Sequence, residues 1–364
     1  MKKDARIYVA GHRGLVGSAI WNNLRSKGYT QLIGRSHGEL DLLDPLAVRR
    51  FFDEERPEYV FLAAAHVGGI MANNTYRADF IYRNLQIQQN VIGESFRHGI
   101  EKLLFLGSTC IYPRDIPQPM KEEALLTAPL EYTNEPYAIA KIAGLKMCES
   151  FNLQYGTNYI AVMPTNLYGP NDNFHLENSH VLPAMIRKIH LARCLVQNDW
   201  TAIRRDMNLR PVNDVDGTAS EEAIVAVLAG YGIEAAAVSL WGTGKPLREF
   251  LWSEEMADAC VYIMEHVDFD DLKPSGKEIR NCHINIGTGK ELSIGSLAHL
   301  IRKTVGYDGE IRFDSTKPDG TMRKLTDVTK LHALGWHHNV EIEEGVERLY
   351  RWYLADLEKS DSRA

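Results

Sequence analysis

The sequence predicts an α/β protein, in which a doubly wound parallel sheet is followed by a smaller mixed α/β domain. Two observations lead to this prediction. In the first half of the chain, short apolar runs alternate with stretches whose apolar residues recur at helical spacing. Such alternation is typical of a parallel sheet with helices on both faces. The chain of 364 residues also has room for two domains, because about 150 residues make one.

The first half is expected to hold five strands and at least three helices. The expected strands are residues 6–10, 31–33, 59–63, 102–106 and 159–163, and the expected helices are residues 15–27, 45–55 and 80–99. The helix at 45–55 has clear start signals, because Asp44 can cap it and Pro45 suits its first turn.

The pattern changes after about residue 170, where prolines become frequent and strands become sparse. We therefore expect a nucleotide-binding domain at 1–170 and a substrate-binding domain at 171–364, with the chain crossing back to the first around 236–265. The second domain is expected to contain strands at 238–240 and 283–286.

A segment at 198–235 stands apart as an insertion. Thr218 to Glu221 has the pattern of a capping box, and an apolar helix follows it. Its stripe of Ile224, Val227 and Leu228 must be buried, either on the chain itself or on a partner.

Composition excludes several classes of protein. The net charge is −7 and no long Lys/Arg run is present, so nothing favours a nucleic-acid partner. No window holds about 18 consecutive apolar residues, so no membrane span is expected. Gly11 interrupts the first apolar run too soon for a signal peptide, which predicts a cytoplasmic protein. Five cysteines without a CxxC pair fit neither a disulfide framework nor a metal site.

A glycine turn lies between the first expected strand and helix. Glycines there let the backbone approach a pyrophosphate, which binds at the helix N-terminus. This predicts a Rossmann-like dinucleotide site, and the GxxGxxG spacing resembles the extended branch of the short-chain dehydrogenases. The turn consists of Gly11, His12, Arg13, Gly14, Leu15, Val16 and Gly17.

The end of the second strand indicates which dinucleotide binds. A chain that binds NAD usually has an acidic residue there, whereas residues 32–37 contain none and include Arg35. Arg13 and Arg35 can hold a 2′-phosphate through charge-assisted hydrogen bonds. We therefore expect NADP(H), although His37 stands where related chains often have a further arginine.

A third motif, Tyr137 to Lys141, has the spacing YxxxK. On a helix this spacing puts both side chains on one face. The lysine is expected to lower the pKa of the tyrosine, making it a usable proton donor. Ser108 ends the fourth strand and is expected to hydrogen-bond a substrate carbonyl, which completes a catalytic triad.

Further motifs resemble the GDP-L-fucose synthase family of extended short-chain dehydrogenases/reductases over nearly the whole chain. They are Gly107 to Pro113, Pro164 to Pro170, Asp172 to Phe174, Asn178 to Val181, Trp241 to Gly244, Arg248 to Phe250 and Lys317 to Gly320.

The resemblance implies an NADPH-dependent 3,5-epimerisation and 4-reduction of GDP-4-keto-6-deoxy-D-mannose to GDP-L-fucose by a homodimer. Cys110 and His180 would be the base and acid of the epimerisation. Asp41 and Leu42 would flank the adenine. The nicotinamide would contact Lys141, His180 and the segment Pro164, Thr165, Asn166 and Leu167, and the GDP-sugar would contact Lys188, Trp241, Arg248 and Asp319.

This assignment is chemically reasonable, because a thiolate and an imidazolium both have pKa values close enough to 7 to move protons. Two alternatives stay open. The same chemistry can act on another GDP-4-keto sugar, a dideoxy-hexose or a 6-deoxy-heptose, and the 198–235 insertion puts substrate scope in doubt. A non-catalytic dinucleotide sensor is the alternative from another class.

Overall fold

Six parallel strands form the main sheet of the computed structural model, which describes residues 1–276 and 278–360. Their order is β10-β5-β4-β3-β1-β2. The strands are β1 (Arg6–Ala10), β2 (Gln31–Ile33), β3 (Tyr59–Leu62), β4 (Lys102–Leu106), β5 (Tyr159–Pro164) and β10 (Ile284–Ile286). The parallel sheet and the five strands expected in the first half are confirmed, with ends that agree to within one residue.

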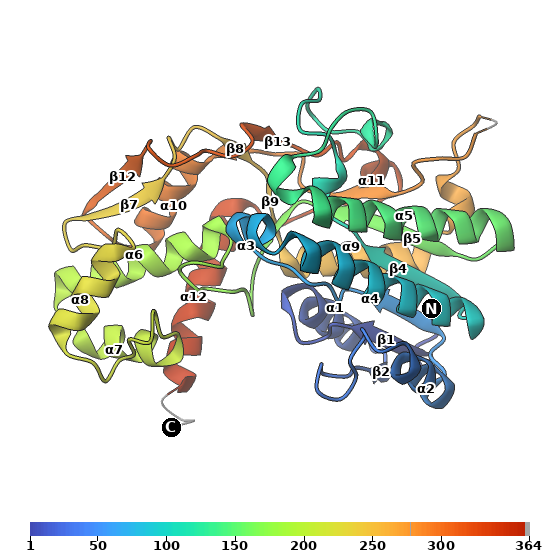
Figure 1. Cartoon of the computed structure of the whole chain (residues 1–364), viewed down its shortest axis with the longest axis horizontal. Coiled ribbons are helices and arrows are strands. Elements are labelled where there is room, and N and C mark those ends of the chain that lie inside the picture. The colour runs from blue at the N-terminus through green and yellow to red at the C-terminus, as the bar shows by residue number, and fades with distance from the viewer. Residues whose placement is uncertain (277, 361–364) are drawn as a thin grey trace. The chain divides into compact units, whose positions relative to one another are not determined.

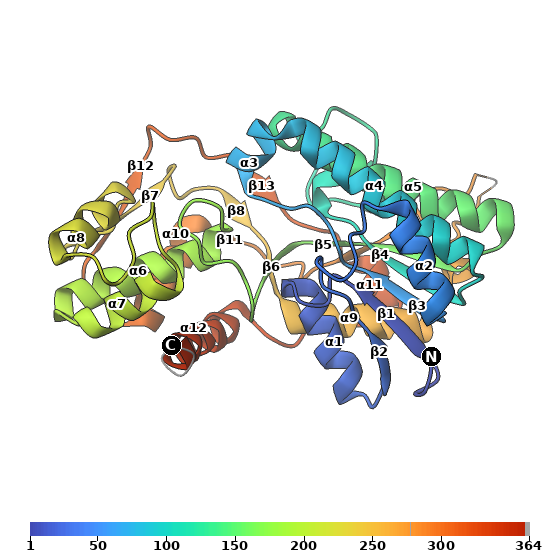
Figure 2. The same ribbon diagram turned by 60° about the horizontal axis from the view of Figure 1, so that its bottom comes forward.

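The sheet is covered on both faces, because successive strand residues point to opposite sides. Ile7 and Val9 pack with α1 (Leu15–Ser26) and α9 (Ser253–His266), whereas Tyr8 and Ala10 pack with the helices on the other face (Figure 2). Those helices are α2 (Pro45–Glu55), α4 (Arg77–Arg97) and α5 (Glu135–Tyr155). Asp44 caps α2 as expected, accepting hydrogen bonds from the N–H groups of Leu46 and Ala47.

The strand predicted at 283–286 was assigned to the wrong part of the chain. As β10 it pairs in parallel with β5, matching Ile284 with Val162, and it forms one edge of the main sheet. Ile284, Asn285 and Ile286 are all fully buried, so a short apolar run far along the chain completes the first sheet.

The chain forms two compact units whose boundaries differ from the expected division at 170/171. The first unit comprises residues 1–167, 249–290 and 324–339, and the second comprises 168–248, 291–323 and the chain from residue 340. The chain was expected to cross back to the first unit around 236–265, and it does so at residue 249. A second return, at 324–339, was not predicted.

In the second unit, β7 (Ala237–Trp241) pairs in parallel with β12 (Glu310–Asp314). The helices of this unit are α6 (Val181–Gln197), α7 (Trp200–Leu209), α8 (Glu221–Gly230), α10 (Ile294–Val305) and α12 (Ile342–Ser360) (Figure 1). The remaining short elements of the chain are α3 (Ile70–Thr75), β6 (Asn166–Tyr168), β8 (Leu247–Arg248), β9 (Phe250–Trp252), β11 (Leu292–Ser293), β13 (Arg323–Lys324) and α11 (Thr329–Ala333).

The 198–235 segment folds as α7 and α8 within its own chain. Ile224 and Leu228 are fully buried and Val227 is half-buried, so the apolar stripe packs on this subunit. The cap of α8 was predicted two residues too early. Ser220, rather than Thr218, is the N-cap, and its hydroxyl accepts a 3.3 Å hydrogen bond from the N–H of Ala223.

Buried charges fix this segment to the rest of its unit. Asp206 on α7 accepts a 2.8 Å hydrogen bond from Nε of Arg187 on α6, and neither side chain is exposed. The hydroxyl of Tyr353 on α12 donates to the same carboxylate. Because buried charges need full pairing, this network specifies how α6, α7 and α12 pack.

The described residues, 1–276 and 278–360, include no helix that is both long and apolar enough to cross a membrane.

Candidate active site

The glycine turn has the geometry that a dinucleotide needs. Gly11 has a φ of +84°, and a Cβ there would lie 2.9 Å from the N atom of Ala64. A Cβ on Gly17 would lie 2.1 Å from the carbonyl oxygen of Gly11. Gly14 precedes α1 without a side-chain cap, so the N–H groups of the first helical turn have no partner within the helix. The turn therefore fits a pyrophosphate group.

The two arginines expected at the cofactor's 2′-phosphate have different surroundings. Arg13 is exposed. Arg35 pairs with Glu55 through one guanidinium nitrogen, and another donates a 2.9 Å hydrogen bond to the carbonyl of Gly34. Arg35 is thus held in place just beyond the second strand, whereas Arg13 is exposed to solvent.

The pair expected beside the adenine lies in the turn before α2. Oδ1 of Asp41 accepts a 2.9 Å hydrogen bond from the N–H of Leu43. Leu42 packs against the core, and its carbonyl accepts a 2.8 Å hydrogen bond from Asn90 on α4. His37 is exposed, with Nδ1 3.7 Å from the Asp41 carboxylate.

Ser108 and Cys110 lie just beyond the carboxyl end of β4. Ser108 caps a short 3₁₀ turn, Thr109–Ile111, and its Oγ accepts a 3.3 Å hydrogen bond from the N–H of Cys110. Cys110 is buried, with 7% of its surface exposed. The turn therefore presents a hydroxyl and a thiol together.

Tyr137 and Lys141 are one turn apart on α5, as the YxxxK spacing predicts. Nζ of Lys141 donates a 2.8 Å hydrogen bond to the carbonyl of Leu106 and lies 5.7 Å from the centre of the Tyr137 ring. That ring packs edge-on against Phe80, with 6.2 Å between the ring centres.

Burial is the largest influence on the pKa values of Tyr137 and Lys141. It raises the pKa of the Tyr137 phenol well above its ordinary value, and the neighbouring Cys110 adds to the rise. The net shift is thus opposite to the lowering expected from Lys141, because burial outweighs the other influences. The ammonium is itself buried, and burial lowers the pKa of Lys141 to about 8. Tyr137 consequently stays protonated, as a proton donor must.

One cation of the first unit, Lys324, was not predicted from the sequence. Burial raises the pKa of the Cys110 thiol, and the largest opposing influence is the charge of Lys324 on β13. Lys324 lies 214 positions along the chain from Cys110, so no local spacing signals their relationship.

Residues 164–167 continue from the end of β5. The N–H of Thr165 donates a 2.9 Å hydrogen bond to the carbonyl of Ile286 on β10. The side-chain amide of Asn166 donates a 2.8 Å hydrogen bond to the carbonyl of Glu249, and Leu167 packs on the core. The segment is thus fixed beside the edge of the sheet by hydrogen bonds to backbone carbonyls.

In the second unit, the same helix positions His180 and Lys188. His180 is the residue just before α6, and desolvation lowers its pKa. Lys188 lies on the third turn of α6, where it is buried. Its Nζ donates a 2.7 Å hydrogen bond to the carbonyl of Tyr231, and burial lowers the pKa of Lys188 to about 8.

The other residues expected around the sugar nucleotide surround the end of β7. Trp241 has 61% of its surface exposed, and Nζ of Lys317 lies 5.5 Å from the centre of its ring. Both oxygens of Asp319 accept hydrogen bonds from Thr243, at 2.7 Å from the N–H and 2.8 Å from the hydroxyl. Asp319 thus holds the turn after Trp241. Burial lowers the pKa of Arg248, and the Asp319 charge opposes this.

All five cysteines are free and buried, as expected for a chain without a disulfide framework. Within residues 1–276 and 278–360, no group of three or more His, Cys, Asp or Glu side chains could hold a metal ion.

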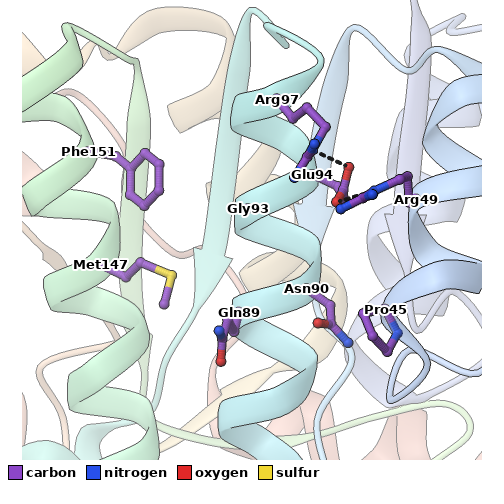
Figure 3. A pocket seen from close by; sticks show the side chains of 9 residues that line it. All are labelled: Pro45, Arg49, Gln89, Asn90, Gly93, Glu94, Arg97, Met147 and Phe151. Carbon is purple, nitrogen blue, oxygen red and sulfur yellow. Dashed lines mark hydrogen bonds and ion pairs between the residues drawn. The ribbon is translucent and has the colours of Figure 1, made fainter.

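A surface hollow of about 470 Å³ lies elsewhere in the first unit (Figure 3). Figure 3 shows Arg49 and Arg97 both reaching the Glu94 carboxylate, at 3.3 and 3.2 Å. The hollow lies along the second halves of α4 and α5, whereas Tyr137 and Lys141 lie in the first half of α5. It is therefore separate from the cluster around Cys110.

Comparison with known proteins identifies the family of the chain. Residues 7–287 match the model of the NAD dependent epimerase/dehydratase family. The chain is 50% identical to GDP-L-fucose synthase 1 of Arabidopsis thaliana, over 98% of this chain and 95% of that protein. It is 47% identical to the GDP-L-fucose synthase of Escherichia coli K12, over 97% of this chain and 98% of that protein.

A solved structure is also similar. It is a GDP-D-glycero-L-gluco-heptose synthase of Campylobacter jejuni in the presence of NADPH. Its sequence is 43% identical, the TM-score is 0.90, and the match covers 97% of this chain and 99% of that one. Since the family model spans most of the sequence and relatives match nearly all of it, the chain belongs to the NAD dependent epimerase/dehydratase family.

Proposed function

We propose that this chain is an NADPH-dependent enzyme that inverts C3 and C5 of GDP-4-keto-6-deoxy-D-mannose and reduces C4, giving GDP-L-fucose. The observation that carries the proposal is the cluster at the end of β4. There a thiol, Cys110, adjoins the hydroxyl of Ser108, and the same unit contributes Tyr137 and Lys141 from α5. Groups suited to proton abstraction and to carbonyl reduction thus occur together.

Epimerisation comes first in this proposal. The 4-keto group acidifies the hydrogens on C3 and C5 of the sugar, so a base of moderate strength can remove them. At each of the two centres, the Cys110 thiolate takes one proton and His180 returns one on the opposite face, and both groups exchange protons with solvent between the two inversions. The charge of Lys324 favours the thiolate, whereas burial opposes it.

Reduction follows at C4. NADPH, when bound, supplies the hydride. Ser108 orients the C4 carbonyl through its hydroxyl, and Tyr137 gives its proton to the C4 oxygen. The raised pKa of Tyr137 keeps that proton on the phenol until charge develops on the sugar oxygen. Lys141 would hold the nicotinamide ribose, and its ammonium is fixed by a hydrogen bond to the carbonyl of Leu106.

The cofactor and sugar contacts are parts of the same proposal. The first unit would bind NADPH, with Arg13 and Arg35 at the 2′-phosphate, and the second would bind the sugar nucleotide. Lys188 and Arg248 are desolvated cations, which suit the diphosphate of GDP. The exposed ring of Trp241 suits contact with the guanine or the sugar.

The test is NADPH oxidation, followed at 340 nm, with GDP-4-keto-6-deoxy-D-mannose as the substrate and NMR identification of the product. We expect turnover to GDP-L-fucose. Tight NADPH binding without turnover of any keto-sugar would overturn the proposal in favour of a dinucleotide sensor.

A GDP-heptose substrate is the second candidate. It is favoured by the 43% identity to a GDP-heptose synthase from Campylobacter jejuni. The same assay with a GDP-4-keto-6-deoxy-heptose, and with a GDP-4-keto-dideoxy-hexose, ranks the three sugars by kcat/KM. A preference of tenfold or more for either alternative would replace the fucose assignment.

We also propose a homodimer that works in the cytoplasm. The dimer is supported by a partly exposed ring cluster on α4 and α5, where the ring of Phe96 lies 4.9 Å from Phe151 and 4.5 Å from Tyr155. The five free cysteines suit a reducing compartment. Measurement of mass in solution tests the dimer, and Phe96→Asp is expected to yield a monomer.

A further inference from the structure

We infer that Tyr231, which follows α8 in the 198–235 insertion, is a positioning residue for the substrate site. Its carbonyl holds the ammonium of Lys188, and its hydroxyl holds Glu177, three residues before His180. The inference rests on the proposed function, in which His180 and Lys188 act on the sugar nucleotide. It assigns the insertion a part in setting that site.

The first contact concerns a buried charge. Lys188 has 8% of its surface exposed, and its Nζ donates a 2.7 Å hydrogen bond to the Tyr231 carbonyl. A carbonyl is neutral, so this bond aims the ammonium without cancelling its charge. A buried cation fixed in this way is preorganised for an anionic group such as a diphosphate.

The second contact reaches the loop that leads to His180. The Tyr231 hydroxyl donates to Oε1 of Glu177, and it lies 3.2 Å from Oδ1 of Asn213. Near its middle, three residues before Glu177, the loop is anchored by Phe174. That side chain is 2% exposed and stacks on Trp352 of α12, with ring centres 6.1 Å apart. The bond from Tyr231 therefore adds an anchor between Phe174 and His180, beside the 3.1 Å hydrogen bond from the N–H of Ser179 to the carbonyl of His175.

Tyr231 can hold both Lys188 and Glu177 in place because its own backbone is fixed. Its N–H donates to the carbonyl of Leu228 at 3.0 Å, which ends α8. The next residue, Gly232, has a φ of +72°, and a Cβ there would lie 2.8 Å from Cβ of Ser239 on β7. Its carbonyl accepts a 2.7 Å hydrogen bond from the N–H of Ser239.

This geometry links the insertion to two candidate substrate residues, Trp241 and Lys188, and to the candidate catalytic residue His180. The strand that fixes Gly232 ends at Trp241, while Tyr231 contacts Lys188 and the loop before His180. Loss of the Tyr231 hydroxyl should loosen the loop and slow proton transfer by His180. The carbonyl, and with it the Lys188 contact, would remain.

The test compares Tyr231→Phe with Glu177→Ala, Glu177→Gln and the double variant of Tyr231→Phe with Glu177→Ala. Epimerisation is read as solvent deuterium entering C3 and C5, and KM for the sugar and for NADPH are measured separately. Tyr307→Phe is the matched control. Its hydroxyl also holds the insertion, through the carbonyls of Glu234 and Ala235, but does not touch the loop.

We expect Tyr231→Phe and Glu177→Ala each to slow deuterium entry roughly three- to tenfold, the effect of one lost hydrogen bond. The double variant should be no slower than either single one, because both remove the same bond. Glu177→Gln should keep the parent rate, since its amide oxygen still accepts. KM for NADPH should not change, and Tyr307→Phe should match the parent.

Deuterium entry at the parent rate in Tyr231→Phe, or an equal loss in Glu177→Gln and Glu177→Ala, would overturn the inference. If Tyr231→Phe fails to fold, the comparison of Glu177→Ala with Glu177→Gln still tests the inference, because Glu177 is exposed. Failure of the proposed function is a separate result, because the unmodified enzyme would then neither exchange nor reduce the sugar.

Discussion

The ammonium of Lys141 donates a 2.8 Å hydrogen bond to the carbonyl of Leu106, the last residue of β4. This bond fastens α5 to the strand end that leads to Ser108 and Cys110. It involves neither the thiol of Cys110 nor the phenol of Tyr137. Substitutions at those two positions therefore leave the frame of the site intact, and the two half-reactions can be tested one at a time.

Replacement of Cys110 should stop epimerisation alone. In Cys110→Ser, a hydroxyl takes the place of a far more acidic thiol, so little base is available near pH 7. We expect deuterium from D₂O to enter C3 and C5 at a rate close to background, while NADPH binds with unchanged affinity. Normal deuterium entry, measured by NMR of the recovered sugar, would show that Cys110 is only a buried apolar residue.

Replacement of Tyr137 should give the opposite pattern. Tyr137→Phe keeps Cys110 and His180, so deuterium should still enter the sugar. NADPH oxidation should fall by roughly 10²- to 10⁴-fold, the usual loss for a missing general acid. If deuterium entry is lost as well, a single set of residues performs both steps, and the division proposed here is wrong.

Arg13 in the glycine turn and Arg35 just beyond the second strand should determine which dinucleotide binds. Arg13→Ala and Arg35→Ala are each expected to raise KM for NADPH roughly ten- to a hundredfold, because a charge-assisted phosphate contact is lost. KM for NADH should change little. Glu55→Gln is the control, since it removes the ion-pair partner of Arg35 and keeps the guanidinium. Equal use of NADPH and NADH by the unmodified enzyme would contradict this prediction.

The buried ion pair of the insertion should matter for stability. In Asp206→Ala, Arg187 keeps a buried charge without its partner, at a cost of about 3–5 kcal/mol. Urea unfolding followed by circular dichroism should show this loss. Glu344→Ala, which removes the exposed partner of Arg348, should cost at most about 0.5 kcal/mol. Equal midpoints for these two variants would mean that the insertion is only loosely attached.

Lys188 should make stability depend on pH in the alkaline range. Burial lowers its pKa from 10.5 to about 8 in the folded chain. Between these values the unfolded chain binds a proton that the folded chain has released, so the free energy of unfolding rises with pH. Urea unfolding from pH 8 to 10.5 should show a smaller rise in Lys188→Met. The exposed Lys121 provides the control, and a slope that Lys188→Met leaves unchanged would refute the prediction.

The sequence determined the parts of this protein that depend on nearby residues. The strand at 6–10, the glycine turn and the Asp44 cap follow from local periodicity and backbone geometry, and all appear where the pattern predicts. The YxxxK spacing likewise puts Tyr137 and Lys141 on one helix because helix geometry is local.

Only the tertiary structure decided the contacts between distant segments. β10 forms the edge of the main sheet, where Ile284 pairs with Val162, and no local residue spacing in the sequence predicts such a pairing. The pKa of Tyr137 rose rather than fell, since burial depends on everything packed around a side chain. Lys324 came to influence Cys110, and Tyr231 came to hold Lys188, for the same reason. Solvation and charge act through space, so their effects appear only once the chain is folded.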